Sequence, residues 1–243
     1  MYLIIDIGNS FHKAAVFSEI GEMVYLVREP ILTKSHFVFL FEQFDISNAI
    51  LATVGVPLTD ILGYMPQRCK SLLLTAETKI PIQLNYNTIN TLGVDRIANA
   101  VAVNSMYRDQ NVLSVQVGSC IVFDFINSYN EYLGGSISPG IEMRFKALHH
   151  FTQKLPLIEK AEIDFLVGTT TQDSILSGVM NGVQYEIEGM IAQYEKLYHP
   201  IKLIITGGND HYLQKSIKNA IFAGSNLVLI GLYKILKLNV TKE

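Results

Sequence analysis

The chain contains 243 residues, of which 49% are hydrophobic and 17% are charged, and its formal net charge is −3. This length is enough for one large domain or two small ones with a well-packed core. A nucleic-acid-binding protein needs a basic face, and 19 Lys and Arg against 22 Asp and Glu give no basic excess. Nucleic-acid binding is therefore not expected as the main activity.

The chain also shows no feature of a membrane or secreted protein. Its two cysteines, Cys69 and Cys120, have neither disulfide-framework nor metal-ligand spacing, which favours a reducing cytoplasm. The amino-terminal stretch has no basic region before its first acidic residue, unlike a signal peptide. The apolar run at 221–238 is interrupted by Asn226 and Lys234 and therefore indicates a buried helix rather than a membrane span. We expect a soluble, cytoplasmic protein.

The first half of the chain alternates short apolar strands with helical patterns. After a strand that opens at residue 3, strands are expected at 13–17, 21–27, 48–54, 71–75 and 81–86, and helices at 34–44, 57–67 and 93–106. The second half is expected to contain a hairpin at 113–125, a glycine turn at 134–135, a helix at 173–198 and a strand at 202–206. Strands and helices mixed in two similar halves indicate α/β architecture.

The opening strand runs directly into Asp6, Gly8, Asn9 and Ser10. An unpaired buried charge is costly, but a carboxylate beside a divalent cation and a polyphosphate is useful. Gly8 lets backbone N–H groups approach a phosphate, and the two polar residues after it add hydrogen-bonding groups. The alternative is an ordinary hairpin turn after a strand.

A second copy of this layout occurs at 113–120, where an apolar strand with Gln116 in the place of Asp6 leads into Gly118 and Ser119. Each copy is followed by another strand-like run, so both predict β-hairpins. Two related halves that present glycine turns to a shared cleft would explain the repeat. A third glycine turn, Gly207-Gly208, follows the strand at 202–206 and would let the backbone approach a nucleotide base or sugar.

The next candidate is Gly93-Val94-Asp95-Arg96, at the start of a predicted helix. Phosphoryl transfer to an alcohol needs positioning, charge neutralisation and a base for the hydroxyl proton. Asp95 beside Arg96 fits a base next to an anion-holding cation. Taken alone, this element favours Asp95 as a helix cap over Asp95 as a base. One hydroxyl of the run at 169–171 is likewise expected to cap the helix after it.

These motifs together resemble the type III pantothenate kinases. The matching segments, in order, are 6–10, 93–96, 118–119, 133–140, Thr171 with Ser177-Gly178, and 206–208. The resemblance extends from residue 3 to Gly231-Leu232, essentially the whole chain. It implies the superfamily of acetate and sugar kinases, heat-shock chaperones and actin, with two ribonuclease-H-like domains and an interdomain nucleotide cleft. The expected domains are residues 1–110 and 111–243, and the last helix could pack back on the first.

The resemblance implies that this protein transfers the ATP γ-phosphate to pantothenate, the first step of coenzyme A biosynthesis. It implies ATP-binding roles for Asp6, Ile7, Gly8, Asn9, Ser10, Phe11, His12, Lys13 and Ser119, with Asp6 near Mg²⁺. It implies pantothenate-binding roles for Tyr86, Gly93, Val94, Asp95, Arg96 and Thr171, with Asp95 as the catalytic base. Members are generally homodimers whose pantothenate site lies near the subunit interface, so Thr171 is expected to act across it.

One position departs from the family pattern. The second turn of the family usually begins with an aspartate that binds K⁺ or NH₄⁺, and this chain has Gln116 there. An amide oxygen brings no charge, so we expect a weak or absent requirement for these cations, unless Asp124 compensates. Two alternatives to a pantothenate kinase stay open from the sequence: a non-catalytic regulatory relative, and a kinase of the same superfamily that acts on another small alcohol.

Overall fold

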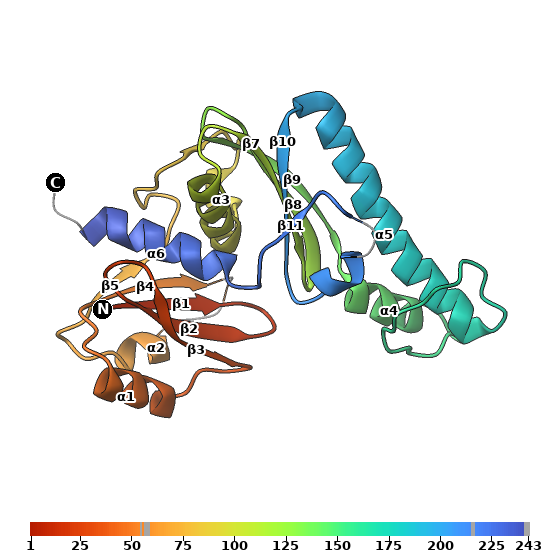
Figure 1. The fold of residues 1–243 in the computed structure, drawn as a ribbon. Coiled ribbons are helices and arrows are strands. Elements are labelled where there is room, and N and C mark those ends of the chain that lie inside the picture. Colours follow the sequence, from red (N-terminus) through yellow and green to blue (C-terminus); the bar gives the residue numbers. More distant parts are fainter. Residues whose placement is uncertain (54, 56–58, 215–216, 241–243) are drawn as a thin grey trace. The chain divides into compact units, whose positions relative to one another are not determined.

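The structure, a computed structural model, describes residues 1–53, 55, 59–214 and 217–240. It contains two compact units, coloured in chain order in Figure 1. Unit 1 comprises residues 1–106 and the chain from Asn226 onward, and unit 2 comprises Tyr107–Ser225. The last helix thus belongs to the same unit as the amino terminus.

Unit 1 is built on a five-stranded sheet in the order β3-β2-β1-β4-β5. The strands are β1 (Tyr2–Ile7), β2 (His12–Phe17), β3 (Met23–Glu29), β4 (Asn48–Thr53) and β5 (Lys70–Leu73). The first three form an antiparallel meander, while β4 runs parallel to β1 and β5 parallel to β4. This order and these directions are those of a ribonuclease-H-like domain.

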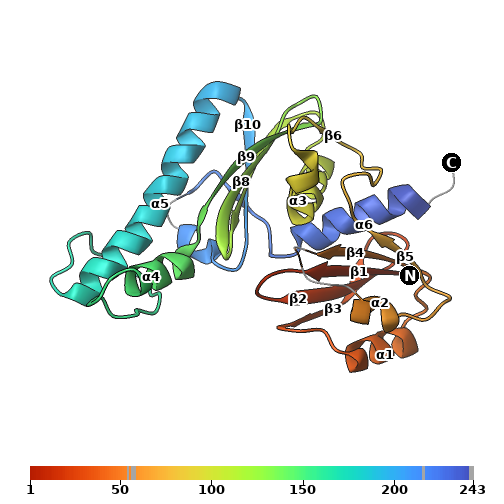
Figure 2. The same cartoon turned by 180° about the vertical axis from the view of Figure 1, so that it is seen from behind.

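Helices cover both faces of the unit 1 sheet, as Figures 1 and 2 show. The helices are α1 (Lys34–Gln43), α2 (Thr59–Gly63), α3 (Val94–Met106) and α6 (Leu227–Val240). On one face, Leu3 and Ile5 of β1 pack with Phe37 of α1 and Ile61 of α2. On the other face, α6 contacts β1, β4 and α3. Because side chains alternate along a strand, Asp6 points to the face that α3 and α6 share.

Unit 2 repeats this topology with the order β11-β10-β7-β8-β9. Its strands are β7 (Asn111–Val117), β8 (Cys120–Ile126), β9 (Glu131–Pro139), β10 (Ile201–Thr206) and β11 (Ile221–Phe222). Again three antiparallel strands come first and two parallel ones follow. The helices α4 (Ile141–His150) and α5 (Thr171–Tyr198) pack on the face that carries Val115 and Val117. The internal repeat and the α/β fold class predicted from the sequence are confirmed.

The glycine turn predicted at Gly134-Gly135 is wrong, because both residues lie inside β9. Gly135 pairs with Asp124 of β8, and a Cβ atom there would lie 1.7 Å from the carbonyl oxygen of Phe123. Glycine is therefore needed for close strand approach rather than for a turn. The helix α4 was not among the expected elements.

Other boundaries differ by a few residues. The predicted strands at 71–75 and 81–86 are β5 and the two-residue β6 (Gln83–Leu84), and the helix predicted at 57–67 is the shorter α2. Positions 54, 57 and 58 of the predicted elements lie outside the described residues. The described residues also include two short 3₁₀ helices, η1 (Ile89–Thr91) and η2 (Asp210–Leu213).

The apolar run at 221–238 contains the strand β11 before the buried helix α6. The prediction of a helix is therefore right only for the later part of the run. Within the part of the chain that the structure describes, no helix is both long and apolar enough to cross a bilayer.

Candidate functional site

Asp6 lies next to the last residue of β1, where the strand enters its glycine turn. Burial raises the pKa of its carboxyl to about 6, Lys13 partly opposes this, and Asp95 adds to it. Lys13 is the register partner of Asp6 on β2. The structure thus brings three of the predicted site residues, Asp6, Lys13 and Asp95, within electrostatic reach of one another. The Asp6 carboxylate is destabilised in this setting and would gain from a bound cation.

The turn after β1 is closed by a hydrogen bond from the Gly8 N–H to the Phe11 carbonyl oxygen, at 3.2 Å. A Cβ atom on Gly8 would lie 3.1 Å from that same oxygen, so a larger residue would press on the turn. Asn9, Ser10 and Phe11 are exposed. The exposed turn therefore presents backbone and polar groups to solvent, as a phosphate-binding turn must.

The first two residues of β2, His12 and Lys13, carry ionisable side chains. The Nδ1 atom of His12 accepts a hydrogen bond from the Leu32 N–H at 3.3 Å, and burial lowers the pKa of this histidine. Burial also lowers the pKa of Lys13, Asp6 counteracts this, and Arg28 adds to the lowering. Arg28 itself stacks over the Phe11 ring, with its guanidinium carbon 4.0 Å from the ring centre.

Asp95 lies in the first turn of α3. Its Oδ1 atom accepts the backbone N–H of Arg96 at 2.9 Å, which holds the side chain at the helix start. A Cβ atom on Gly93 would lie 2.5 Å from the same Oδ1 atom, so a larger residue there would displace this carboxylate. Asp95 therefore makes the backbone hydrogen bond expected of an acid at a helix start, and it also lies within electrostatic reach of Asp6. Helix capping and catalysis are compatible roles for this residue.

Arg96 and Tyr86, both predicted to bind pantothenate, lie close together in unit 1. The Arg96 guanidinium carbon is 6.0 Å from the Tyr86 ring centre, within the range of a cation–π contact. Arg96 is buried, with 7% of its surface exposed. Tyr86, Gly93, Val94, Asp95 and Arg96 thus form one group at the start of α3.

In unit 2, Gly118 and Ser119 form the turn between β7 and β8. The Gly118 N–H donates to the Cys120 carbonyl oxygen at 3.0 Å, and the Gly140 N–H donates to the Ser119 carbonyl oxygen at 3.1 Å. A Cβ atom on Gly140 would lie 2.3 Å from the carbonyl oxygen of Gly118. The turn therefore packs against Gly140, the residue that precedes α4.

Gln116 contacts Asp124, the acid considered above as a possible replacement for the missing charge. Its Nε2 atom donates to Asp124 Oδ2 at 3.4 Å, and the Tyr132 hydroxyl donates to Asp124 Oδ1 at 2.7 Å. Asp124 is completely buried. Both side-chain oxygens of Asp124 thus already accept hydrogen bonds, one of them from the amide of Gln116.

Thr171 is the first residue of α5, and its neighbour Thr170 caps the helix by accepting the Asp173 N–H at 3.1 Å. The expectation that one threonine of this run is a cap is confirmed. Thr171 lies on a different element from Gln116 and Ser119, which flank the turn after β7.

The third glycine turn follows β10. Gly207 has φ of +115°, and a Cβ atom there would lie 2.5 Å from the Val117 carbonyl oxygen. The Asn209 N–H donates to that oxygen at 3.1 Å. The ends of the parallel strands β7 and β10 are thereby joined.

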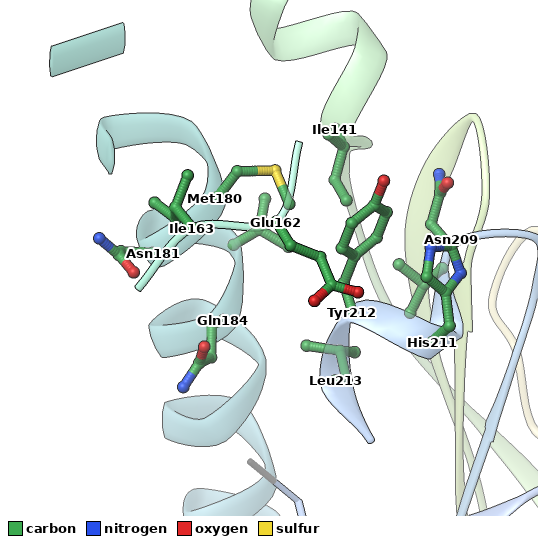
Figure 3. A pocket seen from close by; sticks show the side chains of 12 residues that line it. Ile141, Glu162, Ile163, Met180, Asn181, Gln184, Asn209, His211, Tyr212 and Leu213 are labelled. Atoms are coloured by element: carbon green, nitrogen blue, oxygen red, sulfur yellow. The ribbon is translucent and has the colours of Figure 1, made fainter. Parts of the chain in front are cut away.

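A cavity of about 400 Å³ opens beside this junction, within unit 2 (Figure 3). Its walls come from Val117 and Ile141, Glu162 and Ile163, the α5 residues Met180, Asn181, Val183 and Gln184, and Asn209, His211, Tyr212 and Leu213. Figure 3 shows Met180, Asn181 and Gln184 on one side and His211 and Tyr212 on the other. The carboxyl ends of parallel strands are the usual place for ligands in α/β sheets.

Most residues that line this cavity could not be predicted from the sequence. Asn181 and Gln184 lie within a long amphipathic helix, where single polar residues are indistinguishable from the solvated face. Glu162 and Ile163 lie in an irregular segment with no motif. Only the Gly-Gly turn before Asn209 pointed to this region.

Across the described ranges, no three His, Cys, Asp or Glu side chains come together closely enough to hold a metal ion by themselves. The buried Asp6 carboxylate by itself fits Mg²⁺, which usually binds one or two carboxylates and completes its shell with phosphate oxygens and water.

Known proteins share these features. A solved structure of a conserved protein assigned to the Baf family of transcriptional activators, from Campylobacter jejuni, has the same fold, with a TM-score of 0.61, 24% identity and 98% of each chain covered. Two relatives named type III pantothenate kinase are 38% identical over all of both chains, from Christiangramia forsetii, and 39% identical over 99% of this chain and 100% of the relative, from Cytophaga hutchinsonii.

The duplicated ribonuclease-H-like topology and the glycine turns at the strand ends define an actin-like two-domain kinase fold. Residues 2–193 match the family described as type III pantothenate kinase. The chain belongs to the type III pantothenate kinases.

Proposed function

We propose that this protein transfers the γ-phosphate of ATP to the terminal hydroxyl of pantothenate, giving 4′-phosphopantothenate and ADP in the first step of coenzyme A biosynthesis. The observation that carries the proposal within the site is that two carboxylates, Asp6 and Asp95, lie within electrostatic reach of each other in unit 1, with a glycine turn directly after Asp6. Asp6 suits the binding of a metal–phosphate complex, and Asp95 suits the acceptance of a hydroxyl proton. The identity of the substrate, pantothenate, is inferred from family membership.

The phosphates of ATP are assigned to the turn and strand at 6–13, which comprise Asp6, Ile7, Gly8, Asn9, Ser10, Phe11, His12 and Lys13. Ser119 in unit 2 is assigned a hydroxyl contact to ATP. Backbone N–H groups of a glycine turn and a nearby ammonium both favour polyphosphate. Bound Mg²⁺, held by Asp6, would neutralise charge on the phosphates.

Asp95 is the proposed base. Its carboxylate takes the proton of the pantothenate hydroxyl as that oxygen bonds to the γ-phosphorus, and the bond from phosphorus to the β–γ bridging oxygen breaks to release ADP. The Arg96 N–H holds Oδ1 of this carboxylate at 2.9 Å, which fixes its orientation. Tyr86, Gly93, Val94 and Arg96 would bind the rest of pantothenate.

The cavity in unit 2 is assigned to the nucleoside part of ATP. It lies at the carboxyl ends of β7 and β10 and combines apolar walls with amide, carboxyl and imidazole groups. Its volume of about 400 Å³ falls within the usual range for small-molecule sites. Asn181, Gln184 and Glu162 offer the hydrogen-bonding groups that a heterocyclic base needs.

Monovalent cations are assigned a small role. Gln116 carries no charge, and its amide already faces Asp124. K⁺ or NH₄⁺ would therefore gain less here than at a carboxylate.

We further propose a cytoplasmic homodimer in which Thr171 of one copy serves the pantothenate site of the other. The family expectation supports the dimer, and the position of Thr171 at the exposed start of α5 is compatible with it. The two free cysteines suit a reducing compartment.

The decisive experiment incubates the purified protein with ATP, Mg²⁺ and pantothenate and follows 4′-phosphopantothenate by mass spectrometry. ADP and phosphopantothenate should appear in equal amounts. ADP release without phosphopantothenate would show a different acceptor, and no turnover with any small alcohol would overturn the assignment.

A further inference from the structure

Three polar side chains form a closed hydrogen-bonded triangle at the edge of the cavity in unit 2. Lys160 Nζ pairs with the Glu142 carboxylate and donates to Asn209 Oδ1 at 2.5 Å. Asn209 Nδ2 donates to Glu142 Oε2 at 3.2 Å, which closes the triangle. Asn209, a cavity-wall residue, is 5% exposed.

The corners of the triangle come from three separate parts of the chain. Glu142 lies in the first turn of α4, and Asn209 follows the Gly-Gly turn after β10. Lys160 lies in the segment 151–170, which has no helix or strand and supplies Glu162 and Ile163 to the cavity wall. The triangle therefore attaches an irregular wall segment to the two structured edges of the cavity.

The triangle also fixes which way the Asn209 amide points. A lysine ammonium can only donate and a carboxylate can only accept, so the amide oxygen must face Lys160 and the amide nitrogen must face Glu142. Burial opposes ionisation of Glu142, but the hydrogen bond from Lys160, the backbone N–H of Glu142, the charge of Lys160 and the Asn209 amide together outweigh it and lower the pKa of that carboxyl. The triangle thus favours the Glu142 carboxylate and orients the Asn209 amide.

Lys160 makes one further contact near the cavity. Its ammonium lies 5.9 Å from the ring centre of Tyr212, another cavity-wall residue. From the irregular segment 151–170, Lys160 thereby contacts two residues of the cavity wall, Asn209 and Tyr212.

We propose that Lys160 is a positioning residue for nucleotide binding, which seats the segment 151–170 against the cavity and orients Asn209 in its wall. The inference rests on the proposed assignment of this cavity to the nucleoside of ATP. Lys160 acts through Asn209 and through the segment rather than on the transferred phosphate, so its loss weakens nucleotide binding and spares the chemical step.

The test compares Lys160→Met with Lys154→Met, which removes an exposed lysine from the same segment. Loss of a charge-assisted hydrogen-bond pair should raise the Kd for ATP, and KM for ATP, by about 10-fold or more in Lys160→Met. We expect kcat and KM for pantothenate to stay within about twofold of the wild type, and Lys154→Met to match the wild type. Lys160→Arg keeps the charge and the donors and should recover most of the ATP affinity.

Two measurements separate positioning from general destabilisation. Hydrogen exchange of the segment 151–170 should slow on ATP binding in the wild type and remain fast in Lys160→Met. A Lys160→Met plus Glu142→Gln double variant should lose less ATP affinity than the two single losses added together, because both remove the same triangle.

The inference is overturned if Lys160→Met binds ATP with wild-type affinity, or if kcat falls while KM for ATP does not change. Binding is measured with a fluorescent ATP analogue and does not need turnover. Failure of the wild type to phosphorylate pantothenate would therefore reject the proposed function alone, and unchanged binding in Lys160→Met would reject this inference alone.

Discussion

Asp6 and Lys13 face each other across the β1–β2 pair as register partners, and each draws the other toward its charged form. Burial nevertheless prevails for both, because the pKa of Asp6 is raised to about 6 and that of Lys13 is lowered. In the absence of ligand, the attraction between the two charges therefore does not offset the cost of burying them. A metal–ATP complex, which brings both positive and negative charge, would relieve both groups at once.

The first prediction concerns stability against pH. The unfolded Asp6 carboxyl releases its proton near pH 4 and the folded one only near pH 6, so the folded state binds more protons in between. Stability contributed by this group is therefore lost as pH rises from about 4 to above 6. Asp6→Asn removes this loss, and between pH 4 and 7.5 the wild type should lose about 1–3 kcal/mol more unfolding free energy than the variant. Urea titrations at both pH values measure this, with exposed Asp164→Asn as the control, and parallel pH profiles for wild type and Asp6→Asn would contradict it.

The second prediction separates catalysis from helix capping at Asp95. Asp95→Asn keeps an acceptor for the Arg96 N–H but no proton-accepting carboxylate, so kcat should fall about 100- to 10,000-fold. Affinity for ATP and the Tm should change little. Asp60 occupies the corresponding second position of α2, so Asp60→Asn is the matched control and should keep full activity. Full turnover in Asp95→Asn would leave capping as its whole role.

The third prediction concerns monovalent cations. Initial rates in K⁺, NH₄⁺ and Na⁺ buffers should agree within about twofold, because Gln116 offers no charge. Gln116→Asp would place a second carboxylate beside buried Asp124, so this variant should need K⁺ both for activity and for a wild-type Tm. A severalfold K⁺ dependence of the wild-type rate would refute the prediction.

The fourth prediction uses a matched glycine pair. A Cβ atom on Gly231 of α6 would lie 1.8 Å from the Ala98 carbonyl oxygen of α3, whereas Gly182 of α5 has no atom within 4 Å of such a Cβ position. Gly231→Ala should therefore destabilise unit 1 by about 1–3 kcal/mol. Gly182→Ala should stabilise by about 0.5–1 kcal/mol, because alanine is the better helix former. Thermal unfolding of both variants measures the difference, and equal Tm values would show that α6 can shift away from α3.

The fifth prediction tests whether Thr171 acts across a dimer. Asp95→Asn and Thr171→Val homodimers should each be nearly inactive, and co-expressed mixed dimers should recover activity because one site then has both residues. If Thr171 serves its own chain, the mixed dimers stay inactive. Light scattering must first show a dimer, and a monomeric active protein would dismiss the idea.

Much of the fold was readable from local patterns. The part of β1 before Asp6 is apolar on both sides because helices cover both faces of its sheet, and the sequence shows this as an uninterrupted apolar run. The repeat was visible because Gly8 and Gly118 end equivalent strands. The prediction at 134–135 was wrong because the sequence does not distinguish a glycine required for close strand approach from one required for a turn.

The sequence by itself determined the α/β class, the duplicated glycine turns and the presence of Asp95 at a helix start, because each follows from a short run of residues. Only the tertiary structure decided that the last helix joins the first unit, that burial raises the pKa of Asp6, and that Lys160, Glu142 and Asn209 meet. Those features depend on contacts between residues far apart in the chain, and local sequence propensity does not predict such contacts.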